Sequence, residues 1–327
     1  MVLPNKGDFV LATHGSKSEC ISHMQKDYIQ ANTNGRLHSA SEPSISPLNR
    51  GFLYGDAIYE VWRTFDGVVF AWDEHWQRLE KSASALFMKE LFSRDYIFSE
   101  ITRTCLAFRK ASAYTGELYI RLQISRGCGA IGLDIALADK PEFVIIVQPC
   151  FGLSDEKRRT GLKLTVAKTL RRNPISALNP AWKTGNYLNN ILCLREARAA
   201  GSDEVVILNE RGEITEASVS NLAFVKDGVL ITPPLEVGIL AGITRSITLS
   251  LAVNLGIPVL ERVVKPEELS AMQECMILST TRVIVPVGLI DSISFKVSPD
   301  SVTEKLNQAF EIYMQSSARS HPELKVP

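Results

Sequence analysis

In the first half of the chain, apolar and polar positions alternate in short runs that turn residues interrupt. Strands are predicted over 52–63 and 67–72, joined at Asp66-Gly67, a dipeptide that is typical of tight hairpin turns. A helix over 74–86, capped by Asp73, is predicted next because apolar side chains recur three or four residues apart. The apolar positions of this helix are Trp76, Leu79, Ala83 and Leu86. The other elements predicted here are a helix over 98–113 and strands over 117–126 and 142–148.

A polar segment without apolar periodicity follows, from Pro149 to Gly161. We therefore predict a domain linker at 153–160, between a small α+β domain over 1–152 and a larger domain over 161–327. Strands and helices resume after this segment. The elements predicted there are strands over 163–170, 204–209, 222–226, 229–232 and 276–279, a hairpin turn at 210–212, and helices over 185–200, 243–256 and 302–315.

The composition is that of a globular protein with two cores. The 327 residues are 45% hydrophobic and 22% charged, and this length exceeds the usual size of one domain. Lys and Arg together number 36, as do Asp and Glu, so the formal net charge is zero. Without a basic excess, nucleic acid and anionic membrane are not expected as partners, and a small-molecule ligand is favoured.

The cysteines and the apolar runs bear on the cellular compartment. The six cysteines include no C-x-x-C pair and are expected to be reduced, mostly as core thiols, and no metal site is expected. The longest apolar runs, such as 143–147, are too short to span a bilayer, and the N-terminus lacks the apolar core of a signal peptide. A cytoplasmic protein is expected.

Two segments carry the candidate chemistry. Lys183 lies in N-P-A-W-K-T-G-N-Y over 179–187, and Glu216 lies in G-E-I-T-E-A-S-V-S-N-L over 212–222. A lysine can hold an aldehyde cofactor as a Schiff base, and a carboxylate can keep a pyridine nitrogen protonated. Taken singly, Lys183 is also compatible with a solvated lysine and Glu216 with a charge on a hairpin.

A third segment, G-I-L-A-G-I-T-R over 238–245, leads into an amphipathic helix. The free N–H groups of Ile243 and Thr244 and the positive end of the helix dipole would face an anion there. By itself, the fragment is also an ordinary helix start.

Together these segments resemble the fold-type IV, or class IV, pyridoxal phosphate aminotransferases, a family that includes branched-chain and D-amino acid aminotransferases and aminodeoxychorismate lyases. The resemblance covers about 50–287. The matching blocks are R-G-F-L-Y-G-D-A-I-Y-E over 50–60, E-H-W-Q-R-L over 74–79, 183–187, 216–221, 242–245 and S-T-T over 279–281.

The resemblance implies a small N-terminal α/β domain, a larger C-terminal domain with a barrel-like β core flanked by helices, and a homodimer. It also implies pyridoxal 5'-phosphate as cofactor, with Lys183 as the catalytic lysine, Glu216 at the pyridinium nitrogen and Tyr187 at the phenolic oxygen. Residues implied at the phosphate or against the ring are Arg78, Ile243, Thr244, Thr281 and Leu240. From the residues alone, Arg78 could instead form a surface salt bridge with Glu74 or Glu80.

The implied substrates are amino acids and 2-keto acids, and hydrophobic or branched-chain L-amino acids with 2-oxoglutarate are the first choice. The residues expected to bind them are Tyr54, Tyr59, Arg63, Tyr119, Arg121, Thr280 and Arg282. Tyr119 and Arg121 could also merely share one face of a strand, and Arg282, normally a small residue in this family, could bind a carboxylate or face solvent.

The alternatives are a D-amino acid aminotransferase, an (R)-amine transaminase and a lyase like the aminodeoxychorismate enzymes. The spacing from Lys183 to Tyr187 and the block E-A-S-V-S-N resemble the D-amino acid enzymes. However, the Arg-x-His pair of some of those enzymes would fall near Ile131 and Leu133, which are apolar here.

Overall fold

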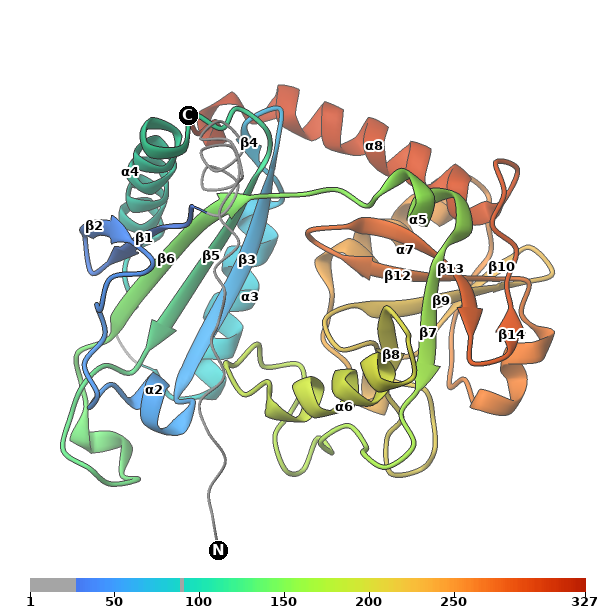
Figure 1. The fold of residues 1–327 in the computed structure, drawn as a ribbon, viewed down its shortest axis with the longest axis horizontal. Coiled ribbons are helices and arrows are strands. Elements are labelled where there is room, and N and C mark those ends of the chain that lie inside the picture. The colour runs from blue at the N-terminus through green and yellow to red at the C-terminus, as the bar shows by residue number, and fades with distance from the viewer. Residues whose placement is uncertain (1–27, 89–90) are drawn as a thin grey trace, which may run out of the picture.

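Two β-sheets, one in each half of the chain, form the framework of the protein (Figure 1). The computed structural model describes residues 28–88 and 91–327. The first sheet is antiparallel throughout, with strand order β2-β1-β6-β5-β3-β4. Its strands are β1 (Gln30–Thr33), β2 (Arg36–Ser39), β3 (Ala57–Phe65), β4 (Val68–Val69), β5 (Leu118–Ser125) and β6 (Glu142–Pro149).

The second sheet is mixed and follows the order β11-β10-β9-β12-β13-β7-β8, with β14 paired to β13. Its parallel pairs are β10 with β11, β13 with β7, and β7 with β8. Its strands are β7 (Leu162–Val166), β8 (Glu204–Val206), β9 (Asn221–Lys226), β10 (Val229–Thr232), β11 (Val259–Glu261), β12 (Glu274–Ser279), β13 (Val283–Ile290) and β14 (Ile293–Ser294). The change from the first sheet to the second falls between Pro149 and Leu162, within the polar segment. The predicted domain boundaries stay a prediction.

Helices cover the sheets and bury their apolar faces. They are α2 (Arg50–Tyr54), α3 (Trp72–Ala85), α4 (Arg94–Ser112), α5 (Asp155–Thr160), α6 (Leu188–Ala199), α7 (Ile243–Asn254) and α8 (Val302–Ser320). Helices α3 and α4 pack on the first sheet, where Leu79 and Phe108 are fully buried with Trp62 of β3. Helices α7 and α8 pack on the second, where Phe310 contributes to another core. Burial of these apolar side chains is the main favourable contribution to folding.

One face of strand β3 packs in the core under α3 and α4, and its other face contacts the second half of the chain. Glu60 and Trp62 point into the helix-covered face and are fully buried. Because side chains alternate along a strand, Tyr59 and Arg63 point the other way, where they contact residues of the second half. The candidate site is built on this face.

Some predicted elements are confirmed and others are wrong in extent. The Asp66-Gly67 turn is confirmed: both residues have positive φ, 51° and 76°, and the turn joins β3 to β4. The strand predicted from 52 is wrong at its start, because Asn49 caps a short helix, α2, that ends at Gly55 in a left-handed conformation. Asp73 does not cap α3. Helix α3 begins at Trp72, two residues before the predicted start at 74, and Ala71 is its N-cap residue.

In the second half, the predicted helix over 185–200 begins later, at Leu188, and the polar segment contains the short helix α5. Strand β13 was not predicted, since Pro286 and Gly288 interrupt its apolar pattern. Strands β1, β2, β11 and β14 were also missed. None of the described helices is long and apolar enough to cross a membrane. The cysteines among the described residues are all free, and Cys20 lies outside this part of the chain.

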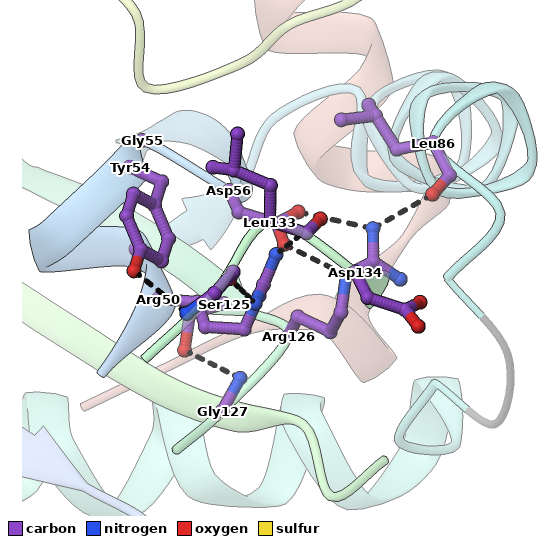
Figure 2. Close-up of polar contacts among 12 residues, drawn as sticks. Arg50, Tyr54, Gly55, Asp56, Leu86, Ser125, Arg126, Gly127, Leu133 and Asp134 are labelled. Carbon is purple, nitrogen blue, oxygen red and sulfur yellow. Dashed lines mark hydrogen bonds and ion pairs between the residues drawn. The ribbon is translucent and has the colours of Figure 1, made fainter. Parts of the chain in front are cut away.

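A charged cluster joins α2 to the segment that follows β5 (Figure 2). Arg50 Nε and Arg126 Nε donate to Asp56 Oδ2 at 2.9 and 2.8 Å, and Arg126 also reaches Oδ1 at 3.0 Å. Arg50 donates in addition to the carbonyls of Gly132 and Leu133. Although burial raises the pKa of Asp56, hydrogen bonds from Arg126 and Arg50 outweigh it and lower that pKa overall.

Replacing Asp56 with asparagine is expected to lower the free energy of unfolding by about 3 kcal/mol at pH 7, since two largely buried arginines lose their anion. A carboxyl group whose pKa is lowered by folding stabilises the protein above its unfolded pKa. The difference between wild type and variant should therefore shrink as the pH falls below about 4. Urea unfolding at several pH values measures this. Asp95→Asn, at a highly exposed carboxylate, is the control, and an equal loss in both variants would contradict the prediction.

Candidate active site

Lys183 lies in the segment between β7 and α6, and this segment is tied to β3. The N–H of Tyr59 donates to the carbonyl of Lys183 at 3.0 Å, and Ile58 and Thr184 form an antiparallel bridge. The Nζ atom of Lys183 lies 4.4 Å from the centroid of the Tyr59 ring. Burial lowers the pKa of Lys183. The neutral amine, which can act as a nucleophile or a base, is therefore more accessible than in an exposed lysine.

Two tyrosine hydroxyls lie beside this lysine. Tyr59 donates a short hydrogen bond to the hydroxyl of Tyr187, which leaves Tyr187 free to donate its own proton to another acceptor. Burial raises the pKa of Tyr187 to about 12 and also raises that of Tyr59. Both hydroxyls therefore stay protonated at neutral pH.

Glu216 is 5% exposed and is held by groups from three segments. Its Oε2 atom accepts from the N–H of Leu240 and from Nδ2 of Asn221, both at 3.1 Å. Its Oε1 atom accepts from Arg172 at 2.6 Å. Burial raises the pKa of Glu216 while Arg172 opposes this effect. The pKa is raised overall, and the cation of Arg172 limits the rise.

Several hydrogen-bond donors also lie close together where α7 begins. Arg78 of α3 donates from NH1 to the carbonyl of Ala241 at 3.0 Å, so it reaches the segment just before this helix. Within residues 28–88 and 91–327, no side chain caps α7, which leaves the N–H groups of Ile243 and Thr244 for another acceptor. The N-cap residue is Gly242, and a Cβ atom there would lie 1.9 Å from Oδ1 of Asn221. A larger residue would displace the Asn221 amide, which donates to Glu216 and to the carbonyl of Leu240.

The side chains of Lys183, Tyr187 and Glu216 and the first residues of α7 line a single cavity. The predicted cofactor residues in its wall are Arg78, Lys183, Tyr187, Glu216, Leu240, Ile243 and Thr244, and the predicted substrate residue Thr280 joins them. The hydroxyls of Ser218 and Ser220 are buried in the same wall and have no hydrogen-bond partner among the described residues. An amine, a carboxylate and a cation at a helix start suit an aldehyde, a ring nitrogen and a phosphate, so this donor set fits pyridoxal phosphate.

The other predicted substrate residues divide between two further places. The guanidinium carbon of Arg121 lies 3.8 Å from the Tyr59 ring centroid. Tyr119 is paired with Arg63 across β5 and β3, and Arg63 donates to the carbonyl of Thr281 at 3.2 Å. Tyr54 is not among the residues that line this cavity. Its hydroxyl accepts from the N–H of Gly132 and its ring packs under Arg50, near Asp56 (Figure 2).

Thr281 and Arg282 do not line the cofactor cavity. With Arg63 they border a second cavity, which lies between α5 and α8. Arg282 is exposed and has no recorded hydrogen bond within the described chain. Its predicted contact with a substrate carboxylate, and the predicted contact of Thr281 with the phosphate, stay predictions.

Sequence reasoning missed several residues of the cavity. Arg172 and Asn190, which hydrogen-bond each other at 2.8 Å, stand outside every matching block. Asn221 lies inside one but was given no role. Arg78 pairs with neither Glu74 nor Glu80 but with the buried carboxylate of Glu60. A pairing between residues so far apart in the chain leaves no local sequence signal.

Comparison with known proteins agrees with this geometry. The family model of amino-transferase class IV matches residues 57–290. A branched-chain-amino-acid aminotransferase of Escherichia coli strain K12 is 32% identical over 292 residues, which cover 87% of this chain and 92% of the relative. A D-alanine aminotransferase of Bacillus licheniformis is 29% identical over 281 residues, covering 85% and 94%.

Among solved structures, a branched-chain aminotransferase from Thermoproteus uzoniensis, crystallised with norvaline, has a TM-score of 0.79 and 30% identity. The match covers 90% of this chain and 98% of that structure.

The two sheets and the lysine-containing cavity between them define a fold-type IV enzyme, a class that uses pyridoxal 5'-phosphate. The chain belongs to the class IV aminotransferase family. It is an enzyme that transfers amino groups between amino acids and keto acids.

Proposed function

We propose that this enzyme acts on hydrophobic L-amino acids, the branched-chain ones first, and uses 2-oxoglutarate as amino acceptor. The observation that carries the proposal is the pair of cations on one tyrosine ring. The guanidinium of Arg121 and the amine of Lys183 lie 3.8 and 4.4 Å from the centroid of Tyr59. In this proposal the substrate extends from Lys183 past the ring of Tyr59, so that its carboxylate meets the guanidinium of Arg121. Branched-chain aminotransferases among the relatives support the choice of side chain.

In this proposal the cofactor residues divide the work by position. Glu216 faces the ring nitrogen, Tyr187 donates to the phenolic oxygen and Leu240 lies against the ring. Arg78, Ile243 and Thr244 hold the phosphate, and the predicted phosphate contact of Thr281 is not part of this arrangement. When bound, pyridoxal phosphate carries the amino group and delocalises the electron pair released at the α-carbon.

Lys183 performs the proton transfer. Its amine, whose pKa is lowered by burial, takes the proton from the substrate α-carbon and later returns a proton on the same side of the cavity. Tyr59 lies against this amine and limits where it can swing, while Arg121 and Arg63 offer cations to the substrate carboxylates. Tyr119 and Thr280 would complete the pocket, whereas the predicted roles of Tyr54 and Arg282, which lie outside this cavity, stay predictions.

The absorbance spectrum of the cofactor-loaded enzyme tests the proposed donor. L-Leucine, L-glutamate, D-alanine and (R)-1-phenylethylamine are titrated separately, and we expect the first two to convert the bound cofactor to its amine form. Conversion by D-alanine alone would instead indicate a D-amino acid aminotransferase. Conversion by the amine alone would show that no carboxylate contact is needed, and the role of Arg121 would be lost. An unchanged spectrum with every donor would contradict the proposal and favour a lyase.

We also propose that the enzyme is a cytoplasmic homodimer. The carbonyls of Gly132 and Leu133 accept from Arg50, which joins α2 to the segment after β5. This joint surface presents Phe52, Ile131 and Leu133 with 73%, 77% and 80% of their area exposed. Large apolar side chains grouped on a surface are typical of protein interfaces. The free cysteines suit a reducing compartment.

Replacing Leu133 with aspartate is expected to shift the protein from dimer to monomer, because an interface core excludes unpaired charge. Sedimentation velocity over a concentration series measures this. Leu255→Asp, at another exposed leucine, is the matched control. A wild-type protein that sediments as a monomer would contradict the proposed dimer. A variant that remains dimeric would show that this surface lies outside the interface.

A further inference from the structure

Two buried ionisable residues near the cofactor cavity take no part in the reaction described above. Glu60 and His75 are 0% and 1% exposed. They belong to two different blocks of the family resemblance, yet neither lines the cavity itself. Burying a carboxylate is costly unless it is paired, so the residues that pair with Glu60 indicate its role.

Glu60 grips Arg78 with both oxygens. Oε1 accepts from Nε of Arg78 at 2.7 Å, and Oε2 accepts from NH2 at 2.9 Å. This bidentate contact fixes the plane of the guanidinium. The remaining nitrogen, NH1, lies at the start of α7, where it donates to Ala241.

His75 holds the carboxylate in its turn. Its Nδ1 lies 2.7 Å from Oε2 of Glu60. Burial lowers the pKa of His75, so the ring is neutral at pH 7 and donates its Nδ1 proton. Burial alone would raise the pKa of Glu60, but Arg78 and His75 outweigh it and hold that pKa well below its usual value. Lys183 is a further charged group that acts on His75.

We propose that Glu60 is a positioning residue for the cofactor phosphate: it orients the guanidinium of Arg78 at the start of α7, and His75 locks the carboxylate. This inference rests on the proposed role of Arg78 at the phosphate. The first strand after α2 thereby contributes to cofactor binding without touching the cofactor.

Glu60 could affect phosphate binding by orienting Arg78 or only through its negative charge. These two explanations predict opposite changes in phosphate affinity when Glu60 is replaced. Glu60→Gln removes a negative charge near the phosphate, and by electrostatics alone the variant would bind an anion more tightly. If Glu60 acts by orienting Arg78, the same variant binds the phosphate more weakly, because a glutamine cannot accept both guanidinium hydrogen bonds.

The test uses two ligands that differ only in the phosphate, pyridoxamine 5'-phosphate and pyridoxamine, added to the cofactor-free protein in a calorimeter. We expect Glu60→Gln to weaken binding of the phosphorylated ligand about tenfold or more, since charge-assisted hydrogen bonds are lost. Binding of pyridoxamine should be unchanged. Unchanged or tighter binding of the phosphorylated ligand, or an equal loss for both ligands, would overturn the inference.

Two controls make the result specific. Glu100→Gln changes another buried carboxylate of the same sheet and helix layer, one that accepts from Asn32 at 2.7 Å, and should leave both affinities unchanged. In an Arg78→Ala background, Glu60→Gln should have no further effect on the phosphorylated ligand. An additional loss there would show that Glu60 acts by another route.

Should Glu60→Gln fail to fold, Arg78→Lys decides the question, because it keeps the charge and loses the bidentate contact. We expect the same phosphate-specific loss, and full retention of affinity would overturn the inference. A wild-type protein that does not distinguish the two ligands would instead refute the proposed phosphate site itself. The two failures are therefore separable.

Discussion

Lys183→Ala is expected to abolish transamination, with a loss of at least about 1000-fold in the rate of the half-reaction with L-leucine. The alanine side chain can neither bind an aldehyde nor move the α-proton, and no other lysine lines the cavity in the described part of the chain. The rate is measured by stopped-flow absorbance after loading with cofactor. The fold should be preserved, because the segment is held to β3 by the backbone of Lys183 rather than by its side chain.

Lys168→Ala, at an exposed position of the same segment, is the control and should keep the wild-type rate. Added methylamine should restore part of the activity of Lys183→Ala, since a small amine can occupy the vacated space and accept the proton. A variant that keeps more than about a tenth of the wild-type rate would show that another group moves the proton.

Glu216→Ala should show the second largest effect, with weaker cofactor binding and a half-reaction slowed by about 100-fold or more. An anion beside the ring nitrogen raises the pKa of that nitrogen and keeps it protonated, which favours electron withdrawal from the α-carbon. The variant also leaves Arg172 without its carboxylate partner in a largely buried place. The cofactor dissociation constant and the single-turnover rate are measured separately.

Glu213→Ala is the matched control for this variant. It lies three residues earlier on the same hairpin and pairs with Arg211 at the surface, away from the cavity. Glu216→Gln should fall between alanine and wild type, because an amide keeps the shape but not the charge. Turnover like that of wild type in Glu216→Ala would overturn the assignment of this carboxylate to the ring nitrogen.

Elements with a regular apolar period and a strong turn signal could be predicted from the sequence. The hairpin at Asp66-Gly67 is one example, because few dipeptides accept two positive φ angles in succession. The short helix α2 could not be predicted in this way. It depends on the Asn49 cap and on Gly55, while its own residues would suit a strand equally well. Strand β13 was hidden by Pro286, which lies just before the pairing with β7 begins at Val287.

The candidate site shows the same division. Lys183 and Glu216 stand in local blocks, and the structure brings both to one cavity with Arg78 and Tyr187. The pairings that set the charge of these residues could not be predicted, whether the partner lies outside the blocks, as Arg172 does, or inside one, as Glu60 does. Arg172 reaches Glu216 across 44 positions, and Glu60 reaches Arg78 across 18. Such pairings follow from how strands and helices pack, and a single sequence carries no record of them.

If the chain were cut between β6 and β7, the hydrogen bond from Tyr59 to Lys183 would connect the two pieces. Arg78 and Tyr59 precede the polar segment at 149–161, whereas Lys183 and Glu216 follow it, so neither half contains a complete reaction centre. A gene encoding either piece alone would yield an inert product. Two pieces divided within that exposed segment carry all the necessary groups between them. Activity regained on mixing would then report directly on their reassociation, and the enzyme could serve as a split reporter.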